Sequence, residues 1–562
     1  MIFVGSEETM FGIQVLALTA TVFATHLWFK THEPKSLTPV YLTIFIIPAF
    51  PAYVFTCSGT SLVLACFVAY TSFPILLMIS IGLYRLSPFH SLAKYPGPTI
   101  AKLSKLWTVY KSVDGKLAQY YKELHDKYGP IVRVGPNEIS VAEKDLLPFI
   151  IGAHGMPKGP LWEGRAFTPK KNRSQQSYNL IGVRDLARHS KLRKTWNRAF
   201  SDGPLQDYQD ILVKNANTLT KFLEEQCKGG SLELDIAHVI SLFSFDFMGD
   251  LAFAAEFNAL CNNDANHFQK NMDKALSTPA LTMQVPWSVW IAQAVPWLLN
   301  TSFRDFGAFA VQQAKLRASN EVRKDLFYHL RSYSDVAEDS MFSFIVSNAV
   351  LAIIAGSDTT ASALSNAIFY LVANPKDMQM LQQEIEDVFP HDDPTAIDVN
   401  KLEDLQWLDA VINETLRLQP PLPSGLQRAP AVGNKGKLVG SHYFKEGTAV
   451  LVSPYVLHRD PRYFFPDPDR FWPARWLPEN AESVTLDTSA FIPFSQGQAS
   501  CVGKRLALFE MKYILVLLFS KYEFVFPAGW EVGSWERGLK DQLVLAKDKL
   551  MVRLTPKSKK NK

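Results

Sequence analysis

The sequence predicts a mainly α-helical protein with a small β region, preceded by N-terminal transmembrane helices. Three consecutive apolar segments before residue 90 predict the transmembrane part. Helical patterns dominate the rest of the 562-residue chain, and short runs rich in β-branched residues lie between them. The expected helices cover residues 103–128, 208–254, 341–374 and 402–418, and the expected strands cover 131–134, 138–141, 448–452 and 543–553.

The apolar segments are residues 10–29, 39–56 and 61–84. Each is close to the roughly 20 residues that a helix needs to cross a bilayer. Glu7 and Glu8 precede the first segment, whereas a cleavable signal peptide would have a basic region there. We therefore expect residues 1–90 to form a membrane anchor with about three transmembrane segments, and residues 91–562 to form a catalytic domain.

The charges between the apolar segments predict an orientation. Lysines follow the first segment, the loop after the second has no charge, and Arg85 and Lys94 follow the third. The positive-inside rule then places the N-terminus in the lumen and the catalytic domain in the cytosol. Pro48 and Pro51 interrupt the second segment, so a re-entrant element is the alternative there.

Composition excludes several classes of protein. The formal net charge is only +4, and nothing in the charge pattern suggests a nucleic-acid partner. The five cysteines are scattered and odd in number, without CxxC spacing, which indicates neither a disulfide framework nor a zinc site. A reducing, cytosol-facing compartment fits this usage.

Cys501 stands in a glycine-containing loop where an amphipathic helix begins. The loop also holds Phe494, Gly497 and Gly503. A helix N-terminus lowers the pKa of a thiol, and glycines allow the backbone to approach a flat group closely. A single thiolate presented in this way suits an axial haem ligand better than zinc, which would need more ligands nearby. A buried free cysteine is the plainer alternative.

A polar group of residues lies in the middle of the long apolar helix expected at 341–374. A mid-helix glycine, Gly356, is unfavourable by about 1 kcal/mol relative to alanine. Threonine hydroxyls can bond back to the preceding turn. We therefore expect the helix to be interrupted at residues 355–360, with Asp358 and Thr359 at a groove. A merely structural kink is the alternative.

Four motifs follow one another in a fixed order. They are A-G-x-D-T-T at 355–360, E-x-x-R at 414–417, P-x-R-W at 473–476 and F-x-x-G-x-x-x-C-x-G at 494–503, the last followed by L-A-x-x-E. Together they resemble the motifs of the cytochrome P-450 family, in its membrane-anchored fungal form. The resemblance runs from about Lys94 to the C-terminus. It implies the cytochrome P-450 fold and a haem b cofactor (iron protoporphyrin IX), with Cys501 as the axial iron ligand.

The resemblance also implies roles for other residues. Asp358 and Thr359 would deliver protons to bound dioxygen, and a buried structural network would contain Glu414, Arg417 and Arg475. The residues implied to contact the cofactor, besides Cys501, are Phe494, Gly497, Gly503, His189, Arg193 and Arg428. Of these, the three basic residues would bind the haem propionates. The family usually has a basic residue two positions before the cysteine; here that residue is Ala499, and Arg428 is expected to compensate.

Two apolar segments are candidates for the walls of a substrate pocket. Residues 154–165 are rich in glycine and proline and include Met156, Leu161 and Trp162. Residues 276–299 contain three prolines and three tryptophans, a composition typical of a membrane interface. Buried or surface loops packed on the core are the alternatives.

The function implied is that of a haem-dependent monooxygenase. It would hydroxylate or otherwise oxidise a hydrophobic small molecule, such as a terpenoid or other secondary metabolite, using dioxygen and NADPH-derived electrons. NADPH-cytochrome P-450 reductase would be its partner, and the endoplasmic reticulum membrane its location. A haem-thiolate isomerase or dehydratase, a non-catalytic membrane haem sensor and, more distantly, a transporter are the alternatives. The Asp358–Thr359 pair argues against the isomerase.

Overall fold

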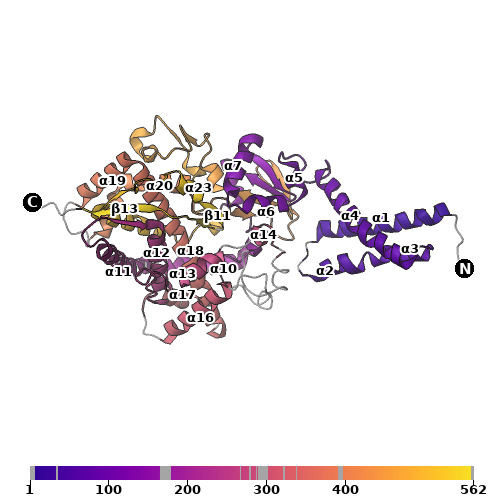
Figure 1. The fold of residues 1–562 in the computed structure, drawn as a ribbon, viewed down its shortest axis with the longest axis horizontal. Helices are drawn as coiled ribbons and strands as arrows, with labels where there is room; N and C mark the ends of the chain where they lie inside the picture. The colour runs from indigo at the N-terminus through magenta and orange to yellow at the C-terminus, as the bar shows by residue number, and fades with distance from the viewer. Residues whose placement is uncertain are drawn as a thin grey trace, which may run out of the picture.

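The computed structural model has a large helical body with a bundle of N-terminal helices at one end (Figure 1). It describes residues 7–557, except 33, 35, 165–178, 266, 277–279, 287, 289–301, 320–322, 337, 390–396 and 543. The described part is mainly α-helical with several small sheets, as the sequence predicts.

The N-terminal bundle is formed by α1 (Glu7–Thr31), α3 (Ala49–Cys57) and α4 (Leu62–Leu86), with α2 (Thr38–Tyr41) and a π-helical turn, Leu42–Ile46, before α3. Phe55, Ala65 and Phe73 are among the side chains buried between these helices. Large apolar side chains also cover the outside of the bundle, including Phe11, Leu16, Phe23, Phe50, Tyr53, Val63, Phe67, Met78 and Leu83. An apolar exterior of this kind suits a lipid environment better than water.

Five helical segments are long and apolar enough to cross a membrane by length and composition. Three are the N-terminal segments Glu8–Thr31, Thr38–Cys57 and Leu62–Leu86. The other two, Ile236–Phe253 and Ser340–Ala373, belong to helices of the body. The first of these is almost entirely buried, so its hydrophobicity reflects a protein core.

Residues 103–128 do not form the single helix that the sequence predicts. The structure has α6 (Leu106–Ser112) and α7 (Leu117–Tyr128) instead. Between them Gly115 adopts φ +73°, in the left-handed region that favours glycine. A side chain there would also meet Lys540. The chain therefore turns at Gly115, and the prediction of one helix was wrong.

The largest sheet has four strands in the order β1-β2-β7-β4. β1 (Ile131–Gly135) and β2 (Glu138–Val141) form the predicted antiparallel hairpin. β7 (Ala449–Val452) pairs in parallel with β2 and antiparallel with β4 (Leu426–Arg428). An isolated antiparallel bridge then joins Arg428 of β4 to Lys158. The sheet thus brings residue 158 next to residue 428.

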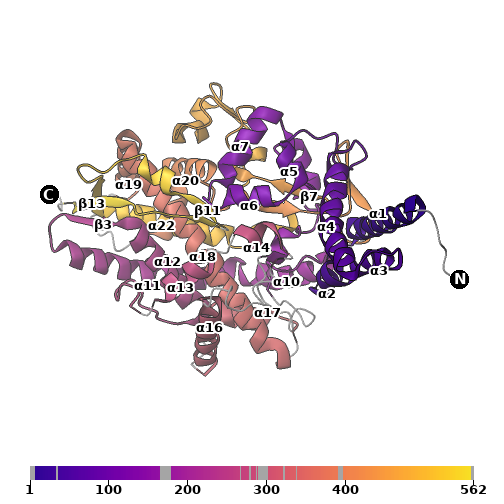
Figure 2. The same ribbon diagram turned by 45° about the vertical axis from the view of Figure 1, so that its right-hand side comes forward.

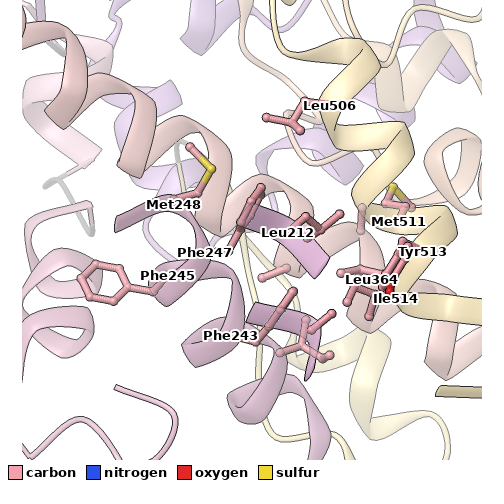
Figure 3. Close-up of a cluster of buried hydrophobic side chains, with 14 of the residues drawn as sticks. Leu212, Phe243, Phe245, Phe247, Met248, Leu364, Leu506, Met511, Tyr513 and Ile514 are labelled. Carbon is pink, nitrogen blue, oxygen red and sulfur yellow. The ribbon is translucent and has the colours of Figure 1, made fainter. Parts of the chain in front are cut away.

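The helical core is built on α12 (Ile236–Phe253), α18 (Glu338–Ala373) and α22 (Lys504–Lys521). α18 packs against both of the others. Figure 3 shows Phe243 and Phe247 of α12 and Leu364 of α18 in the same buried cluster as Ile514 of α22. In Figure 2 these three helices lie in the middle of the body. This packing fixes the start of α22, and with it the loop that contains Cys501.

α18 is a continuous α-helix, and the predicted interruption at residues 355–360 was wrong. Thr359 Oγ1 donates to the Ala355 carbonyl at 2.6 Å without breaking the helix. Gly356 has a packing role, because a Cβ there would lie 2.6 Å from Met248 Sδ. The missing side chain lets α12 and α18 approach each other.

The helical pattern at residues 208–254 also contains a break. α11 (Asp202–Cys227) ends at Lys228 in a left-handed conformation, and β3 (Leu232–Asp235) precedes α12. β3 is an edge of the sheet β10-β13-β3. The expected strand at 543–553 is likewise two strands, β12 (Val544–Ala546) and β13 (Met551–Pro556).

The remaining elements complete the body. The helices are α5 (Thr99–Leu103), α8 (Leu147–Ile150), α9 (Leu161–Gly164), α10 (Leu186–Ala199), α13 (Phe268–Leu276), α14 (Ala280–Gln284), α16 (Ser302–Ser319), α17 (Leu326–Tyr333), α19 (Pro375–Val388), α20 (Gln406–Leu418), α21 (Pro454–Leu457) and α23 (Ser534–Gly538). The strands are β5 (Gly436–Val439), β6 (His442–Lys445), β8 (Phe464–Phe465), β9 (Thr485–Leu486), β10 (Tyr522–Val525) and β11 (Lys540–Gln542).

Candidate active site

The Cys501 loop is closed by its own backbone. The Cys501 N–H donates to the Phe494 carbonyl at 2.8 Å, and the Ser500 N–H donates to Gly497 at 3.1 Å. Gly497 adopts φ +67°, and a Cβ there would overlap the backbone of Gly152. The loop can therefore sit this close to Gly152 only with glycine at position 497.

Cys501 is an exposed residue, although its loop packs against Gly152 of the body. Surrounding protein raises the pKa of this thiol; the Gly503 N–H and the charges of Arg193 and Lys504 act in the opposite direction. α22 begins at Lys504, with Gly503 as its preceding residue. A helix N-terminus and two cations favour a thiolate, and metal coordination would favour it further.

Asp358 and Thr359 of α18 lie in different local settings. Asp358 Oδ1 forms an ion pair with Lys547 Nζ at 2.8 Å. The Thr359 hydroxyl donates to Ala355, as described above, and Ala355 itself is exposed in spite of its place in a core helix. This side of α18 therefore borders open space.

A second feature is a cluster of basic side chains around a small cavity. Lys158, His189 and Arg428 line the cavity and are all nearly fully buried. Ala499 lies at the same cavity, so the position where a basic residue was expected does face this cluster. Lys158 Nζ donates to the carbonyls of Leu180 and Ile181 at 2.8 and 2.9 Å.

These basic side chains disfavour one another's positive charge. Burial and then the charges of Arg428 and Arg193 lower the pKa of Lys158 to about 7. Burial and then the charges of Lys158, Arg193 and Arg428 lower the pKa of His189 to about 4. Burial lowers the pKa of Arg428 to about 10. A buried group of this kind is expected to hold an anion, since unpaired buried charge is strongly unfavourable.

Arg193 connects the basic cluster to the cysteine loop. Its guanidinium donates to the Ser500 carbonyl, and to Ser500 Oγ at 3.3 Å. Its charge acts both on His189 and on the Cys501 thiol. Arg193 thus links the thiol to the cluster of buried basic side chains. This arrangement fits haem, whose iron takes a thiolate ligand and whose propionates are anions.

Glu414, Arg417 and Arg475 meet in the core. Arg417 donates to both Glu414 oxygens at 2.8 and 2.9 Å, and Arg475 Nε donates to Glu414 Oε1 at 3.0 Å. Trp476 Nε1 and the Trp472 N–H donate to the same carboxylate at 3.0 and 2.9 Å. Burial raises the pKa of Glu414, but the two arginines outweigh it and the pKa lies below its ordinary value.

The structure brings Cys501, Phe494, Gly497 and Gly503 into one loop, with Arg193 beside them. His189 and Arg428 are together at the cavity, and their roles stay predictions. Met156, Leu161 and Trp162 are buried, and Trp162 Nε1 donates to the Gln427 carbonyl at 3.2 Å. Most of the tryptophan-rich segment 276–299 lies outside the described residues.

Sequence reasoning missed two lysines. Lys158 lies in the loop 154–165, and Lys547 follows β12. Neither lysine belongs to a motif. Their partners, Arg428 and Asp358, are distant in the sequence, so no local pattern predicts these contacts. The bridge between Lys158 and Arg428, for example, depends on the β-sheet.

The sequence of this chain is similar to those of known proteins over most of its length. A family model described as Cytochrome P450 matches residues 96–553. Cytochrome P450 monooxygenase FCK2 of Fusarium pseudograminearum is 32% identical over 86% of this chain and 85% of its own. Cytochrome P450 monooxygenase orf5 of Eupenicillium brefeldianum is 29% identical over 85% and 94%. Cytochrome P450 monooxygenase lcsK of Purpureocillium lilacinum is 27% identical over 97% and 98%, which includes the N-terminal region.

Proposed function

Because this chain belongs to the cytochrome P450 family and is a P450 monooxygenase with a haem-thiolate cofactor, we propose that Cys501 is the axial ligand of a haem b. The observation that carries this assignment is that Arg193 acts on the Cys501 thiol, while Ala499 of the same loop lines the cavity of the buried basic residues Lys158, His189 and Arg428. We further propose that the enzyme oxidises a hydrophobic small molecule, such as a terpenoid or other secondary metabolite.

The side chains of the site would have distinct roles in binding the cofactor and in moving protons. The Cys501 thiolate holds the iron, and the Gly503 N–H together with Arg193 and Lys504 stabilises its negative charge. The basic cluster binds the propionates. When bound, the haem supplies the activation of dioxygen with electrons from NADPH. The Thr359 hydroxyl can turn from Ala355 towards the open side of α18 and donate a hydrogen bond there, while Asp358 supplies protons to it.

Electrons would come from NADPH-cytochrome P-450 reductase. Lys504 and Arg505 are exposed at the start of α22, directly after the cysteine loop. Exposed charge of this sign steers an acidic partner to the side of the molecule that carries the thiolate. Reversing both charges, with Lys504→Glu and Arg505→Glu, is expected to slow reduction by the reductase at low salt. Unchanged reduction rates would contradict this docking site.

The N-terminal apolar helices would anchor the enzyme to a membrane, which we propose is that of the endoplasmic reticulum. The bundle supports three crossings by the length, hydropathy and apolar exterior of its segments. Charges between the segments favour a cytosolic catalytic domain. A glycosylation acceptor placed before residue 7 should be modified in cells, and one placed after residue 557 should not.

The central test replaces Cys501 with serine. Reduced, carbon-monoxide-treated wild type should show the Soret band typical of sulfur ligation, and Cys501→Ser should lose it. Microsomes with the wild type and reductase should consume NADPH and form an oxygen-dependent product from a panel of apolar compounds. Cys227→Ser, at a buried cysteine of α11, is the matched control and should keep both properties. A sulfur-ligated band in Cys501→Ser would overturn the assignment, and haem binding without any turnover would favour a sensor.

A further inference from the structure

His458 joins the buried ion-pair network of Glu414 to the segment that leads into the cysteine loop. It follows α21, and its side chain is completely buried. Its Nδ1 lies 3.1 Å from the Arg417 carbonyl in the last turn of α20, and its Nε2 lies 2.9 Å from the Ile492 nitrogen. Arg417 Nη1 donates in return to the His458 carbonyl at 2.7 Å. One imidazole ring therefore bonds to both segments.

The two hydrogen bonds fix the tautomer of His458. A backbone N–H can only donate, so Nε2 accepts from Ile492, and Nδ1 carries the ring proton and donates it to the Arg417 carbonyl. Burial and then the charge of Arg417 lower the pKa of His458 to about 3. The ring is therefore neutral near neutral pH, and both bonds persist there.

Ile492 lies just before the Cys501 loop. The Ser495 N–H donates to the Ile492 carbonyl at 3.0 Å, and the Phe494 carbonyl accepts the Cys501 N–H at 2.8 Å. Ile492 is itself buried. If His458 Nε2 were removed, the Ile492 N–H would be a buried donor without its acceptor, which is strongly unfavourable. The segment before the loop should then shift to find another partner.

A second contact links the same two regions. Trp476 Nε1 donates to Glu414 Oε2 at 3.0 Å, and the Trp476 ring packs against Phe491 with their centroids 4.8 Å apart. The Phe491 ring centroid lies 5.2 Å from that of His458. Two routes therefore lead from the Glu414 carboxylate to the start of the loop, one through Arg417 and one through Trp476, and both reach His458.

We propose that His458 is a positioning residue for the iron ligand, because its bond to Ile492 fixes the loop of Cys501 relative to the Glu414–Arg417 ion pair. The inference rests on the proposed function, since it concerns the loop of the proposed ligand. A loop held in this way keeps the sulfur in place for ligation. A released loop lets the thiolate leave the iron with its electron pair and take a proton from solvent.

Three substitutions separate the two hydrogen bonds of the ring. His458→Phe removes both and keeps an aromatic side chain. His458→Gln has an amide oxygen at a reach similar to that of Nε2, so it can still accept from Ile492. His458→Asn is shorter and can bond only to the Arg417 carbonyl. The proposal requires His458→Gln to behave like the wild type and His458→Asn to behave like His458→Phe.

The matched control is His125→Phe. His125 is also a buried histidine that bridges two segments, since its Nδ1 lies 2.9 Å from the Gly129 carbonyl and its Nε2 lies 2.8 Å from Ser140 Oγ. It belongs to α7, outside the cysteine loop and the ion-pair network. This variant shows what the loss of two buried hydrogen bonds does when the loop is not involved.

The first measurement follows the sulfur ligand of the iron. In the reduced, carbon-monoxide-treated holoenzyme, the sulfur-ligated Soret band should decay at least about tenfold faster in His458→Phe and His458→Asn than in the wild type, equivalent to about 1.4 kcal/mol. In His458→Gln and His125→Phe the decay should be as slow as in the wild type. Equally fast decay in His125→Phe, or slow decay in His458→Phe, would overturn the proposal.

The second measurement follows the loop itself. Amide hydrogen exchange of the wild-type holoenzyme should be slow in peptides covering residues 490–503. His458→Phe should accelerate exchange in these peptides, whereas His125→Phe should accelerate it only around α7. Unchanged exchange over residues 490–503 in His458→Phe would contradict the proposed role. If His458→Phe takes up no haem, His458→Gln decides, because the proposal fails unless this variant assembles with the sulfur-ligated band.

These outcomes separate the inference from the proposed function. A wild type that lacks the sulfur-ligated band fails the proposed function itself. A wild type that has the band, with His458 variants that keep it as long as His125→Phe does, fails only the positioning role of His458.

Discussion

Arg475 Nε lies 3.0 Å from Glu414 Oε1 across 61 residues of sequence, and both side chains are completely buried. Arg417 binds the same carboxylate from the other side. The three residues join α20 to the short helix Pro473–Trp476, about twenty residues before the Cys501 loop.

Replacing Arg475 with leucine should destabilise the protein strongly. Removal of one partner from a buried ion pair leaves the other charge uncompensated and typically loses about 3–5 kcal/mol. The thermal unfolding midpoint of the full-length protein in detergent should fall accordingly, together with the yield of haem-containing protein. Arg505→Leu is the control, because it breaks an exposed pair with Asp202 and should lose less than about 1 kcal/mol. Equal losses in the two variants would contradict a structural role for the network.

Gly497→Ala should impair the cysteine loop far more than an alanine at another left-handed glycine. Both Gly497 and Gly447 have positive φ, +67° and +85°, where a side chain is unfavourable by about 1–2 kcal/mol. A Cβ on Gly497 would in addition overlap the Gly152 backbone, whereas a Cβ on Gly447 meets nothing within 4 Å. The haem content of purified protein, measured against total protein, should drop in Gly497→Ala and stay near normal in Gly447→Ala. A similar haem content in both would show that the loop can move away from Gly152.

The sequence predicted the elements whose signals are local. The β1–β2 hairpin follows from β-branched runs around Gly135 to Asn137, and the start of a helix just after Cys501 follows from the glycine-containing loop. Predictions were wrong where a tertiary contact outweighs a local conformational preference. Gly356 suggested a break in α18, but its missing side chain serves the packing of Met248.

Parts of the site could not be predicted because they depend on contacts between distant segments. Lys158 reaches Arg428 through a β-bridge, and Lys547 reaches Asp358 across 189 residues. No spacing rule connects such pairs. Motifs indicated the residues expected at the cofactor, whereas the charges around these residues became visible only in three dimensions.

The free energy of unfolding should fall as pH rises, because the buried carboxyl of Glu510 resists ionisation in the folded protein. Burial raises the pKa of this carboxyl to about 8, against a smaller effect of the Ser244 hydroxyl at 3.1 Å. In the unfolded chain glutamate ionises near its ordinary pKa of about 4.3. Between these values the unfolded chain loses a proton that the folded protein keeps. Ionisation therefore favours the unfolded state increasingly as pH rises, by on the order of 4 kcal/mol at pH 8.

Glu510→Gln removes this ionisation and tests it. The unfolding midpoint of the variant, relative to the wild type, should rise steadily from pH 5 to pH 8. Glutamine also brings an extra amide donor, which changes the midpoint of the variant by the same amount at every pH. The test is therefore the slope of the midpoint difference against pH. Glu482→Gln, at an exposed glutamate, should show a nearly constant difference. A flat profile for Glu510→Gln would mean that Glu510 is ionised in the folded protein.

Lys158 should hold haem in the place of the basic residue that Ala499 replaces. Lys158→Met removes a buried cation from the cavity that both residues line, and haem transfer to apomyoglobin should become at least about tenfold faster, equivalent to about 1.4 kcal/mol. Lys191→Met is the control, because Lys191 is an exposed lysine of α10. It should leave the transfer rate unchanged.

The double variant Lys158→Met, Ala499→Arg separates charge from structure. Lys158 also donates to the carbonyls of Leu180 and Ile181, and an arginine at 499 does not replace these bonds. If the propionates need a cation at this cavity, the double variant should recover slow haem transfer while its unfolding midpoint stays as low as that of Lys158→Met. Fast transfer in the double variant, with a low midpoint, would assign Lys158 a purely structural role, since lost carbonyl contacts would then account for both effects.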